Sequence, residues 1–307
     1  MATVIQSGNF GRLLEPGLRK LFFETYKEKP EQYSKFMNVQ RSSKSVEVDA
    51  RMGGFSMWNK KGTLDSTEYE GALPPEEKFY KHETFSKGFI IEKEMVDDEK
   101  FNTIAKYPKA LARAARATIE SLAASVLNES FTAKADNWKG EALVGDHQRL
   151  DGGTTTNYIG KLTLSEQNLE IAMKLASEQV DERGLKIQMT PDTLIIPRKL
   201  EFTAEKIVKS VHLPGTDYND VNPMQGRFKI VVLDYIDPAL ENCWWLLDST
   251  MNPLNWFWRE RLNFKGYYTD FDTDAVKFKG RFRCSCGWTD HRGILGANPD
   301  PDSASGN

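Results

Sequence analysis

Apolar residues recur with helical spacing over one long stretch of the chain, residues 100–131. Pro108 suits a first helical turn, and no glycine or further proline follows it within the stretch. The residues that share one helical stripe are Leu111, Ala115, Ile119, Leu122 and Val126. Arg113, Arg116 and Glu120 lie off that stripe, so we expect a helix packed on one side and solvated on the other. At ~1.5 Å per residue it spans roughly 35 Å, which is typical of a strut within a larger assembly.

Two strand-like stretches flank a polar, glycine-rich segment within residues 44–92. In the first, Val46 and Val48 alternate with charged neighbours, and the second runs over 79–91. Two strands joined by a polar tip describe a long projecting hairpin, which holds little core because an isolated hairpin is marginally stable in water. Large apolar side chains near the tip are better explained by a neighbouring subunit than by solvent. These are Phe55, Met57 and Trp58.

The region before this hairpin, residues 1–43, is predicted to be an extended arm with one short helix. Pro16 stands near the start of that helix and Pro30 beyond its end. Because so small a segment cannot offset its own ordering entropy, we expect the arm to lie across other surfaces. The face of the helix carries Leu18, Leu21, Phe22 and Tyr26.

From about residue 161 the pattern changes to that of an α/β domain. Thr163 or Ser165 can cap a helix that runs to about Leu175, and residues 199–211 predict a second helix. Buried strands are predicted at 193–197, 228–233 and 244–247. A segment of about 100 residues with this pattern is large enough to form its own core.

Residues 273–288 then alternate between basic and apolar positions, which predicts a long strand. The basic face carries Lys277, Lys279, Arg281 and Arg283. The opposite face carries Val276, Phe278, Phe282, Cys284 and Cys286. A basic strand face can meet a phosphate backbone, but the chain lacks an overall basic balance. We therefore interpret this face as solvated or as part of a contact between subunits.

Composition argues against several classes of protein. The 41 basic and 44 acidic residues give a net charge of −3. The chain therefore lacks the strong positive charge that is typical of nucleic-acid-binding proteins. No run approaches the ~18 apolar residues of a membrane span, and the N-terminus lacks the features of a signal peptide. Three cysteines do not make a disulfide framework. We expect a soluble protein that contacts no membrane and is made in a reducing cytoplasm.

The common catalytic signatures are missing from the sequence. It has no Walker phosphate loop, no GxGxxG after a strand, no HExxH and no GxSxG. Its histidines are His82, His147, His212 and His291. Asp146–His147 and Asp290–His291 suggest acid–base pairs, but adjacent side chains rarely point at each other. We favour turn or interface roles for them, and predict no catalytic residue and no cofactor.

Cys284, Cys286 and His291 present the one arrangement that resembles a metal site. Cysteines two apart on a strand share a face, so both thiolates could reach one zinc ion. Zinc takes four ligands, however, and only Cys243 remains as a distant fourth. We favour buried free thiols and predict no metal.

A dense aromatic cluster offers a second alternative to a purely structural role. It comprises Trp244, Trp245, Trp256 and Trp258. Such a cluster can form a stacking platform for a sugar or a single-stranded nucleic acid. We favour a β-sheet core, because each tryptophan lies within an apolar, strand-like run.

The order of these parts resembles the major capsid proteins of tailed bacteriophages with the Hong Kong 97-type fold, and among them the Mu-type major head subunit family. The resemblance covers roughly residues 40–295. The stretches that carry it are Gly54–Trp58 with 60–62, 88–98, 142–147 followed by 152–157, and 191–197. None of these motifs is diagnostic alone, and their order is what makes the resemblance specific.

The resemblance implies an α+β fold whose parts follow a fixed order. They are an N-terminal arm (1–43), an extended β-hairpin loop (44–92), a peripheral domain with the long spine helix (93–139), an inserted α/β axial domain (140–252), a return to the peripheral domain along a long β-strand (253–298) and a disordered tail (299–307). In this family the loop lies across a neighbour and the arm ties subunits together. The implied interface residues are Leu18, Phe22 and Tyr26 of the arm and Phe55, Met57, Trp58, Lys60 and Lys61 of the loop.

The implied function is that of a major capsid protein that self-assembles, as pentamers and hexamers, into an icosahedral shell around double-stranded DNA. The implied partners are further copies of the chain, a scaffolding protein, a portal, a decoration protein and the packaged DNA, which is contacted non-specifically. Assembly would take place in the cytoplasm of a bacterial host, and the product would be part of the virion. The rival interpretations are an encapsulin-like compartment shell, a His147- or metal-dependent enzyme, and a carbohydrate- or nucleic-acid-binding module.

Overall fold

The computed structural model describes residues 8–51, 53–63, 66–71, 76–92, 94–95, 101–134, 140–149, 151–211, 221–267 and 275–299. Within these ranges the chain mixes helices and strands, as the expected α+β class requires. His212, the acidic residues 97–99 and all of the expected tail except residue 299 lie outside the described residues. No described helix has the length and apolar character needed to span a membrane.

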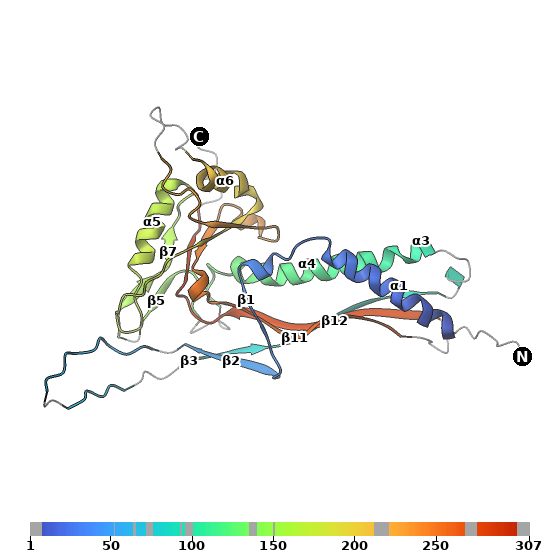
Figure 1. Cartoon of the computed structure of the whole chain (residues 1–307), viewed down its shortest axis with the longest axis horizontal. Helices are drawn as coiled ribbons and strands as arrows, with labels where there is room; N and C mark the ends of the chain where they lie inside the picture. Colours follow the sequence, from blue (N-terminus) through green and yellow to red (C-terminus); the bar gives the residue numbers. More distant parts are fainter. Residues whose placement is uncertain are drawn as a thin grey trace, which may run out of the picture.

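A four-stranded sheet and two long helices form an elongated lower layer (Figure 1). The strands, in their order across the sheet, are β1 (Asn38–Arg41), β11 (Leu254–Tyr267), β12 (Val276–Trp288) and β4 (Glu83–Ile91). β1 is parallel to β11, and the other neighbours are antiparallel. The helices α1 (Gly8–Lys27) and α4 (Lys106–Asn128) lie together against one face of this sheet. The short helix α3 (Phe101–Ile104) precedes α4.

Strand β12 shows the alternation that the sequence predicts. Phe278, Phe282 and Cys284 are buried, whereas Lys277 and Lys279 are exposed. The apolar side chains face the helices because a strand directs successive side chains to opposite sides of the sheet. The basic face is therefore turned away from α1 and α4.

Helix α4 is buried on more of its surface than its sequence predicts. Arg116 and Glu120, expected on a solvated side, are only 8% and 5% exposed. The last turn of α1 and the segment after it cover these two residues. The Glu120 carboxylate accepts hydrogen bonds from the backbone N–H groups of Gln32 (3.0 Å) and Tyr33 (2.9 Å). Arg116 lies 3.8 Å from the centre of the Tyr26 ring. A buried carboxylate is thus stabilised by backbone N–H donors, and a buried guanidinium by the face of an aromatic ring.

Helix α1 is also longer than predicted, because it extends through Pro16 to both sides of that residue. Proline inside a helix removes one hydrogen bond and costs roughly 3 kcal/mol. Burial of Leu18 and Phe22 offsets this cost, since both lie in a core shared with Phe264 and Phe278. Tertiary packing therefore overrides the local signal.

A second, upper layer contains a five-stranded sheet with two helices. The strands, in their order across the sheet, are β7 (Tyr158–Gly160), β13 (Ile294–Ala297), β10 (Trp244–Leu247), β8 (Thr193–Pro197) and β9 (Lys229–Leu233). The helices are α5 (Glu166–Ser177), which Ser165 caps as predicted, and α6 (Glu201–Lys209). β13 returns to this sheet after β12, so the last described segment of the chain completes the upper layer.

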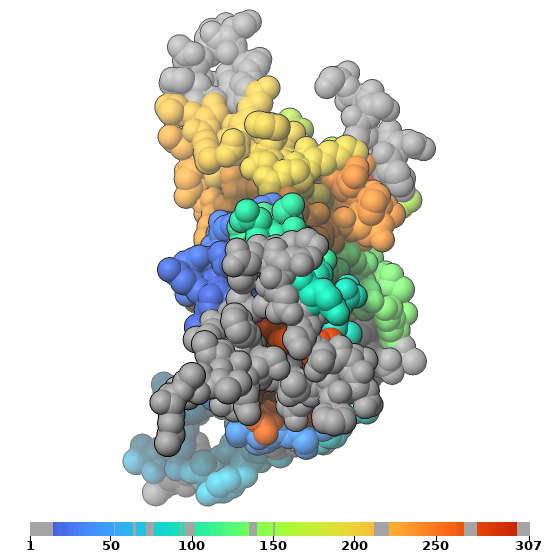
Figure 2. All heavy atoms as spheres, turned by 90° about the vertical axis from the view of Figure 1, so that its right-hand side faces the viewer, coloured from blue at the N-terminus to red at the C-terminus, as the bar shows by residue number. Residues whose placement is uncertain are grey.

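The predicted hairpin has a different second strand from the one expected. β2 (Val46–Arg51) pairs with β3 (Glu76–Lys81), and the remainder of the predicted strand is β4, which belongs to the four-stranded sheet. The break falls at His82, between the two strands. Figure 2, an end-on view, shows the hairpin (blue and cyan) at the bottom and the upper layer (yellow and orange) at the top.

The remaining described elements are short. They are the pair β5 (Asp146–Gln148) and β6 (Thr154–Thr156) and the 3₁₀ turns η1 (Tyr33–Lys35), η3 (Arg198–Leu200), η4 (Pro238–Leu240) and η5 (Ser249–Met251).

Candidate assembly surface

The hairpin continues beyond β2 and β3 into a protruding loop, residues 53–63 and 66–71 (Figure 1). Large apolar and aromatic side chains of this loop face solvent. Their exposed fractions are 97% for Trp58, 91% for Tyr69, 75% for Met57 and 59% for Phe55. A cluster of this kind on a segment without a core is typical of a surface that another protein covers.

Hydrogen bonds between side chains and backbone hold the two limbs of the loop together. The backbone N–H and the hydroxyl of Ser56 both donate to the Glu70 carboxylate at 2.8 Å. The Asn59 amide donates to Glu68 at 2.8 Å. The hydrogen bond from the Ser56 N–H is the largest cause of a lowered pKa at Glu70. The carboxylate therefore stays ionised, and both of its oxygens remain hydrogen-bond acceptors.

Lys60 and Lys61 are exposed near the tip of the loop, beside the apolar residues. Lys61 donates to the Thr67 hydroxyl at 3.4 Å. The aromatic surface of the loop suits the core of a contact with another protein, and the two lysines suit its polar rim.

The three interface residues expected in the N-terminal arm lie inside the chain's own structure. Leu18 and Phe22 are buried, and the Phe22 ring stacks on Phe264 at 4.7 Å between centroids. Tyr26 is half-buried beneath Arg116, and burial raises the pKa of its hydroxyl to about 12. These side chains stabilise the lower layer, and their contact with a neighbouring subunit stays a prediction.

The two histidines considered as catalytic candidates lie against each other. The rings of His147 and His291 stack at 3.8 Å between centroids with a 12° angle between their planes, and both are 1% exposed. Nδ1 of His147 lies 2.8 Å from the Glu141 carboxylate. The other ring nitrogens find no hydrogen-bond partner among the described residues. No local sequence pattern indicates this pairing, because the two histidines are far apart in the chain.

Because of this histidine pair, we expect the free energy of unfolding to fall at acidic pH. Burial, followed by the neighbouring His147, lowers the pKa of His291 well below its ordinary value of 6.5. Above about pH 6.5 both folded and unfolded states hold a neutral ring, so stability is unaffected. Below that pH the unfolded state binds the proton more readily, so the free energy of unfolding falls as pH drops toward the folded-state pKa.

Urea unfolding of the unassembled subunit at pH 7.5, 6.5 and 5.5 measures this effect. The His291→Asn variant should lose less stability between pH 6.5 and 5.5 than the parent chain. Some slope remains, because burial and Arg283 also lower the pKa of His82. Identical pH slopes for the variant and the parent chain would contradict the assignment.

The structure does not gather Cys284, Cys286 and His291 into a metal site. Among the described residues, no group of three histidine, cysteine, aspartate or glutamate side chains could hold a metal ion. The three cysteines are free thiols, and burial raises the pKa of the Cys243 thiol to about 12. A thiol with so high a pKa is a poor metal ligand and nucleophile at neutral pH.

The tryptophan cluster forms core, as the strand-like pattern predicts. Trp244, Trp245 and Trp256 are fully buried and Trp258 is 3% exposed. The indole N–H of Trp244 donates to the Leu162 carbonyl at 2.9 Å. These rings are therefore not available as a stacking platform.

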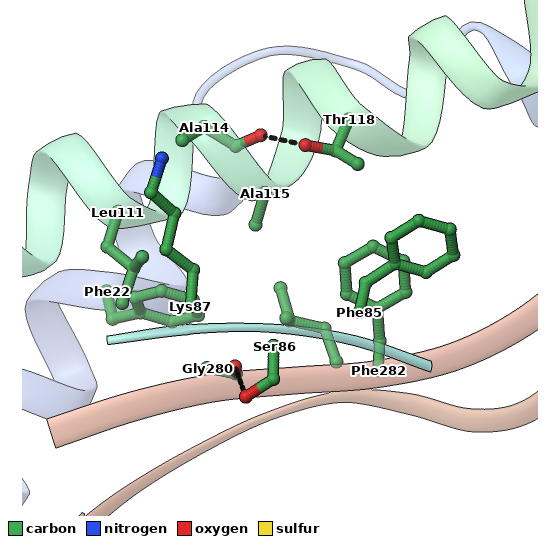
Figure 3. A pocket seen from close by; sticks show the side chains of 11 residues that line it. Phe22, Phe85, Ser86, Lys87, Leu111, Ala114, Ala115, Thr118, Gly280 and Phe282 are labelled. Carbon is green, nitrogen blue, oxygen red and sulfur yellow. Dashed lines mark hydrogen bonds between the residues drawn. The ribbon is translucent and has the colours of Figure 1, made fainter. Parts of the chain in front are cut away.

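A cavity of about 220 Å³ lies between α4 and the sheet. Figure 3 shows Phe85 and Phe282 stacked on one side of it and Leu111 on the other. The hydroxyls of Thr118 and Ser86 donate to backbone carbonyl groups. Lys87 is the one titratable group among the residues that line the cavity. The cavity offers no acid–base pair and does not resemble a catalytic site.

Comparisons with known proteins point to one family. The family model described as phage capsid protein matches residues 75–297. No curated protein sequence matches the chain. Three similar structures are the virus-like particle from Pyrococcus furiosus (14% identity, TM-score 0.54, covering 92% of this chain and 98% of that one), Mycobacterium phage Adephagia (12%, 0.53, 89% and 91%) and the capsid of Cyanophage P-SCSP1u (11%, 0.53, 88% and 88%). At these identities the likeness is one of fold.

Proposed function

The chain belongs to the phage capsid protein family and is a major capsid protein with the Hong Kong 97-type fold, and we propose that its protruding loop is the element that joins neighbouring subunits. Members of the family are structural proteins of the bacteriophage head, and capsid subunits associate with copies of themselves. The observation that carries the proposal is the exposure of Phe55, Met57, Trp58 and Tyr69 on a loop that has no core of its own.

The two layers suggest how one subunit is placed in the shell. We infer that the four-stranded sheet with α1 and α4 is the peripheral domain and the upper layer is the axial domain, completed by β13. Phe202 and Val221 of the upper layer are 81% and 76% exposed, which suits contacts between copies around five- and six-fold axes. The lower layer would then form the contacts between capsomers.

The remaining partners follow from the role of a head subunit. We propose a Mu-type head subunit that assembles in the bacterial cytoplasm with a scaffolding protein, a portal and a decoration protein. The packaged DNA would be contacted without base recognition. We assign no catalytic step to the chain.

One other shell function shares this fold. The likeness in fold to the Pyrococcus furiosus virus-like particle favours, as a second candidate, a compartment that encloses protein cargo. Particles purified after nuclease treatment distinguish the two: packaged double-stranded DNA supports the head subunit, and protein cargo with no nucleic acid supports the compartment.

Substitution of Trp58 tests the role of the loop. Because this ring is 97% exposed, Trp58→Ser should leave the subunit folded. A central aromatic contact contributes about 2 kcal/mol or more to an interface, and 1.4 kcal/mol is tenfold in affinity. We therefore expect the concentration needed for assembly to rise at least tenfold, as measured by light scattering and electron microscopy.

The matched control is Trp58→Phe, which keeps an aromatic side chain and should assemble at close to the normal concentration. If Trp58→Ser assembles as readily as Trp58→Phe, the loop does not join subunits through this residue.

A further inference from the structure

One turn of the upper layer, residues 181–184, contacts the protruding loop of the same chain. The turn is closed on itself: the Asp181 carboxylate accepts hydrogen bonds from the backbone N–H groups of Arg183 (2.9 Å) and Leu185 (2.8 Å). Gly184 has a φ of +79°, a conformation that favours glycine. The turn is thus a fixed platform, and the direction of the side chains at 182 and 183 is set by its backbone.

Arg183 binds both limbs of the loop at once. Its Nε donates to the carbonyl of Gly54 on the outgoing limb at 2.7 Å. Its Nη2 donates to the carbonyl of Gly71 on the returning limb at 2.8 Å, and Nη1 pairs with the Glu70 carboxylate. A guanidinium group presents several donors in one rigid plane, so a single side chain can fix the two limbs relative to each other.

The preceding residue of the turn holds the end of the hairpin. Glu182 pairs with Arg51, the last residue of β2, and their side chains are 2% and 5% exposed. Removing one partner of a buried pair is strongly destabilising, since it leaves the other charge without compensation. This pair therefore ties the loop end of the hairpin to the upper layer, two residues before the loop begins.

The backbone of the loop approaches the turn closely at Gly54. A Cβ atom at this position would lie 3.1 Å from the Asp181 carboxylate, which is tighter than an ordinary contact. Figure 1 shows the loop leaving the hairpin beneath the lower end of the upper layer, where this contact occurs. The loop is consequently anchored at two successive points before it becomes free.

We propose that Arg183 is a positioning residue that sets the direction of the loop relative to the upper layer before the subunit meets a neighbour. This rests on the proposed function, in which the loop joins subunits. A loop held in its binding direction loses less conformational freedom on association, so binding is stronger and its angle is defined. The angle at which neighbouring subunits meet then depends on Arg183. Because this angle sets how strongly the shell curves, the shell diameter depends on Arg183 as well.

Amide hydrogen exchange of the full-length, unassembled chain tests the contact itself. In Arg183→Ala, the peptide that contains Ser56 should exchange about tenfold faster than in the parent chain. The Ser56 N–H donates to the Glu70 carboxylate, and Arg183 holds that carboxylate in place. Arg183→Lys keeps the charge but cannot span both limbs, so its exchange should be intermediate. Arg198→Ala is the matched control, because Arg198 is an arginine of the upper layer that pairs with Glu201 and Asp234. Unchanged exchange in Arg183→Ala would overturn the proposal.

Electron microscopy of the assembled variants tests the consequence. Arg183→Ala should form shells with a broader range of diameters, or open sheets and tubes, whereas Arg198→Ala shells should match the parent. Faster exchange together with shells of normal diameter would overturn the claim that Arg183 sets the angle. Failure of the parent chain to form shells would instead count against the proposed function, and the exchange experiment would still report on the contact.

Discussion

Deletion of residues 53–75 is expected to abolish shell assembly while the rest of the subunit stays folded. The described part of the loop exposes its large side chains, and β2 and β3 form a separate two-stranded sheet. That sheet stays anchored to the lower layer through the buried Tyr80, whose ring packs on Phe257 at 5.0 Å between centroids. Removal of the loop therefore takes away little buried apolar surface. The deletion also removes Gly54, Glu70 and Gly71, which are the partners of Arg183. Otherwise it removes only the surface that we assign to contact between subunits.

Electron microscopy measures whether the deleted chain assembles, and near-ultraviolet circular dichroism measures whether its core stays folded. A two-glycine linker between β2 and β3 closes the shortened hairpin. The deleted chain should show no closed particles and should keep the tryptophan signal of the buried core. Normal shells from the deleted chain would exclude the loop as an assembly element, and loss of the tryptophan signal would show that it belongs to the fold.

Truncation of Trp256 should have the largest effect on stability of any single substitution considered. This side chain is fully buried and packs against Tyr33 and Trp258, with ring centroids 4.9 and 5.2 Å away. Replacing a buried tryptophan by alanine typically costs about 3–5 kcal/mol of unfolding free energy, because the cavity collapses only partly. We expect a loss of this size in urea unfolding of the unassembled Trp256→Ala subunit.

The matched control for this substitution is Trp58→Ala, the same change at a 97% exposed position. It should alter the unfolding free energy by less than about 0.5 kcal/mol. Similar losses for both variants would mean that Trp256 is not part of the core.

Features with a local cause were predictable from the sequence. The strands at β8 and β10 are short apolar runs, and both are buried along their whole length. The alternation along β12 follows from the two faces of a strand and was read directly from the order of residues. The exposed apolar residues of the loop were also predictable, because nothing near them in the sequence could cover them.

Features with a cause far away in the sequence were not predictable. Glu120 is buried because Gln32 and Tyr33, about 90 positions away, supply the donors for its carboxylate. His147 meets His291, which lies even farther away in the sequence. The contact of Arg183 with Gly54 and Gly71 also depends on how the protruding loop meets the upper layer, which periodicity does not report. Local sequence patterns carry no signal for such pairs.

We infer that copies of this chain build a closed shell and that the protruding loop joins them. Cryo-electron microscopy of the purified full-length protein, alone and together with a scaffolding protein, tests it most directly. We expect closed icosahedral particles in which the loop of each subunit lies across a neighbour, with Trp58 buried at the contact. A monodisperse monomer under every condition, or shells in which Trp58 remains in solvent, would contradict it.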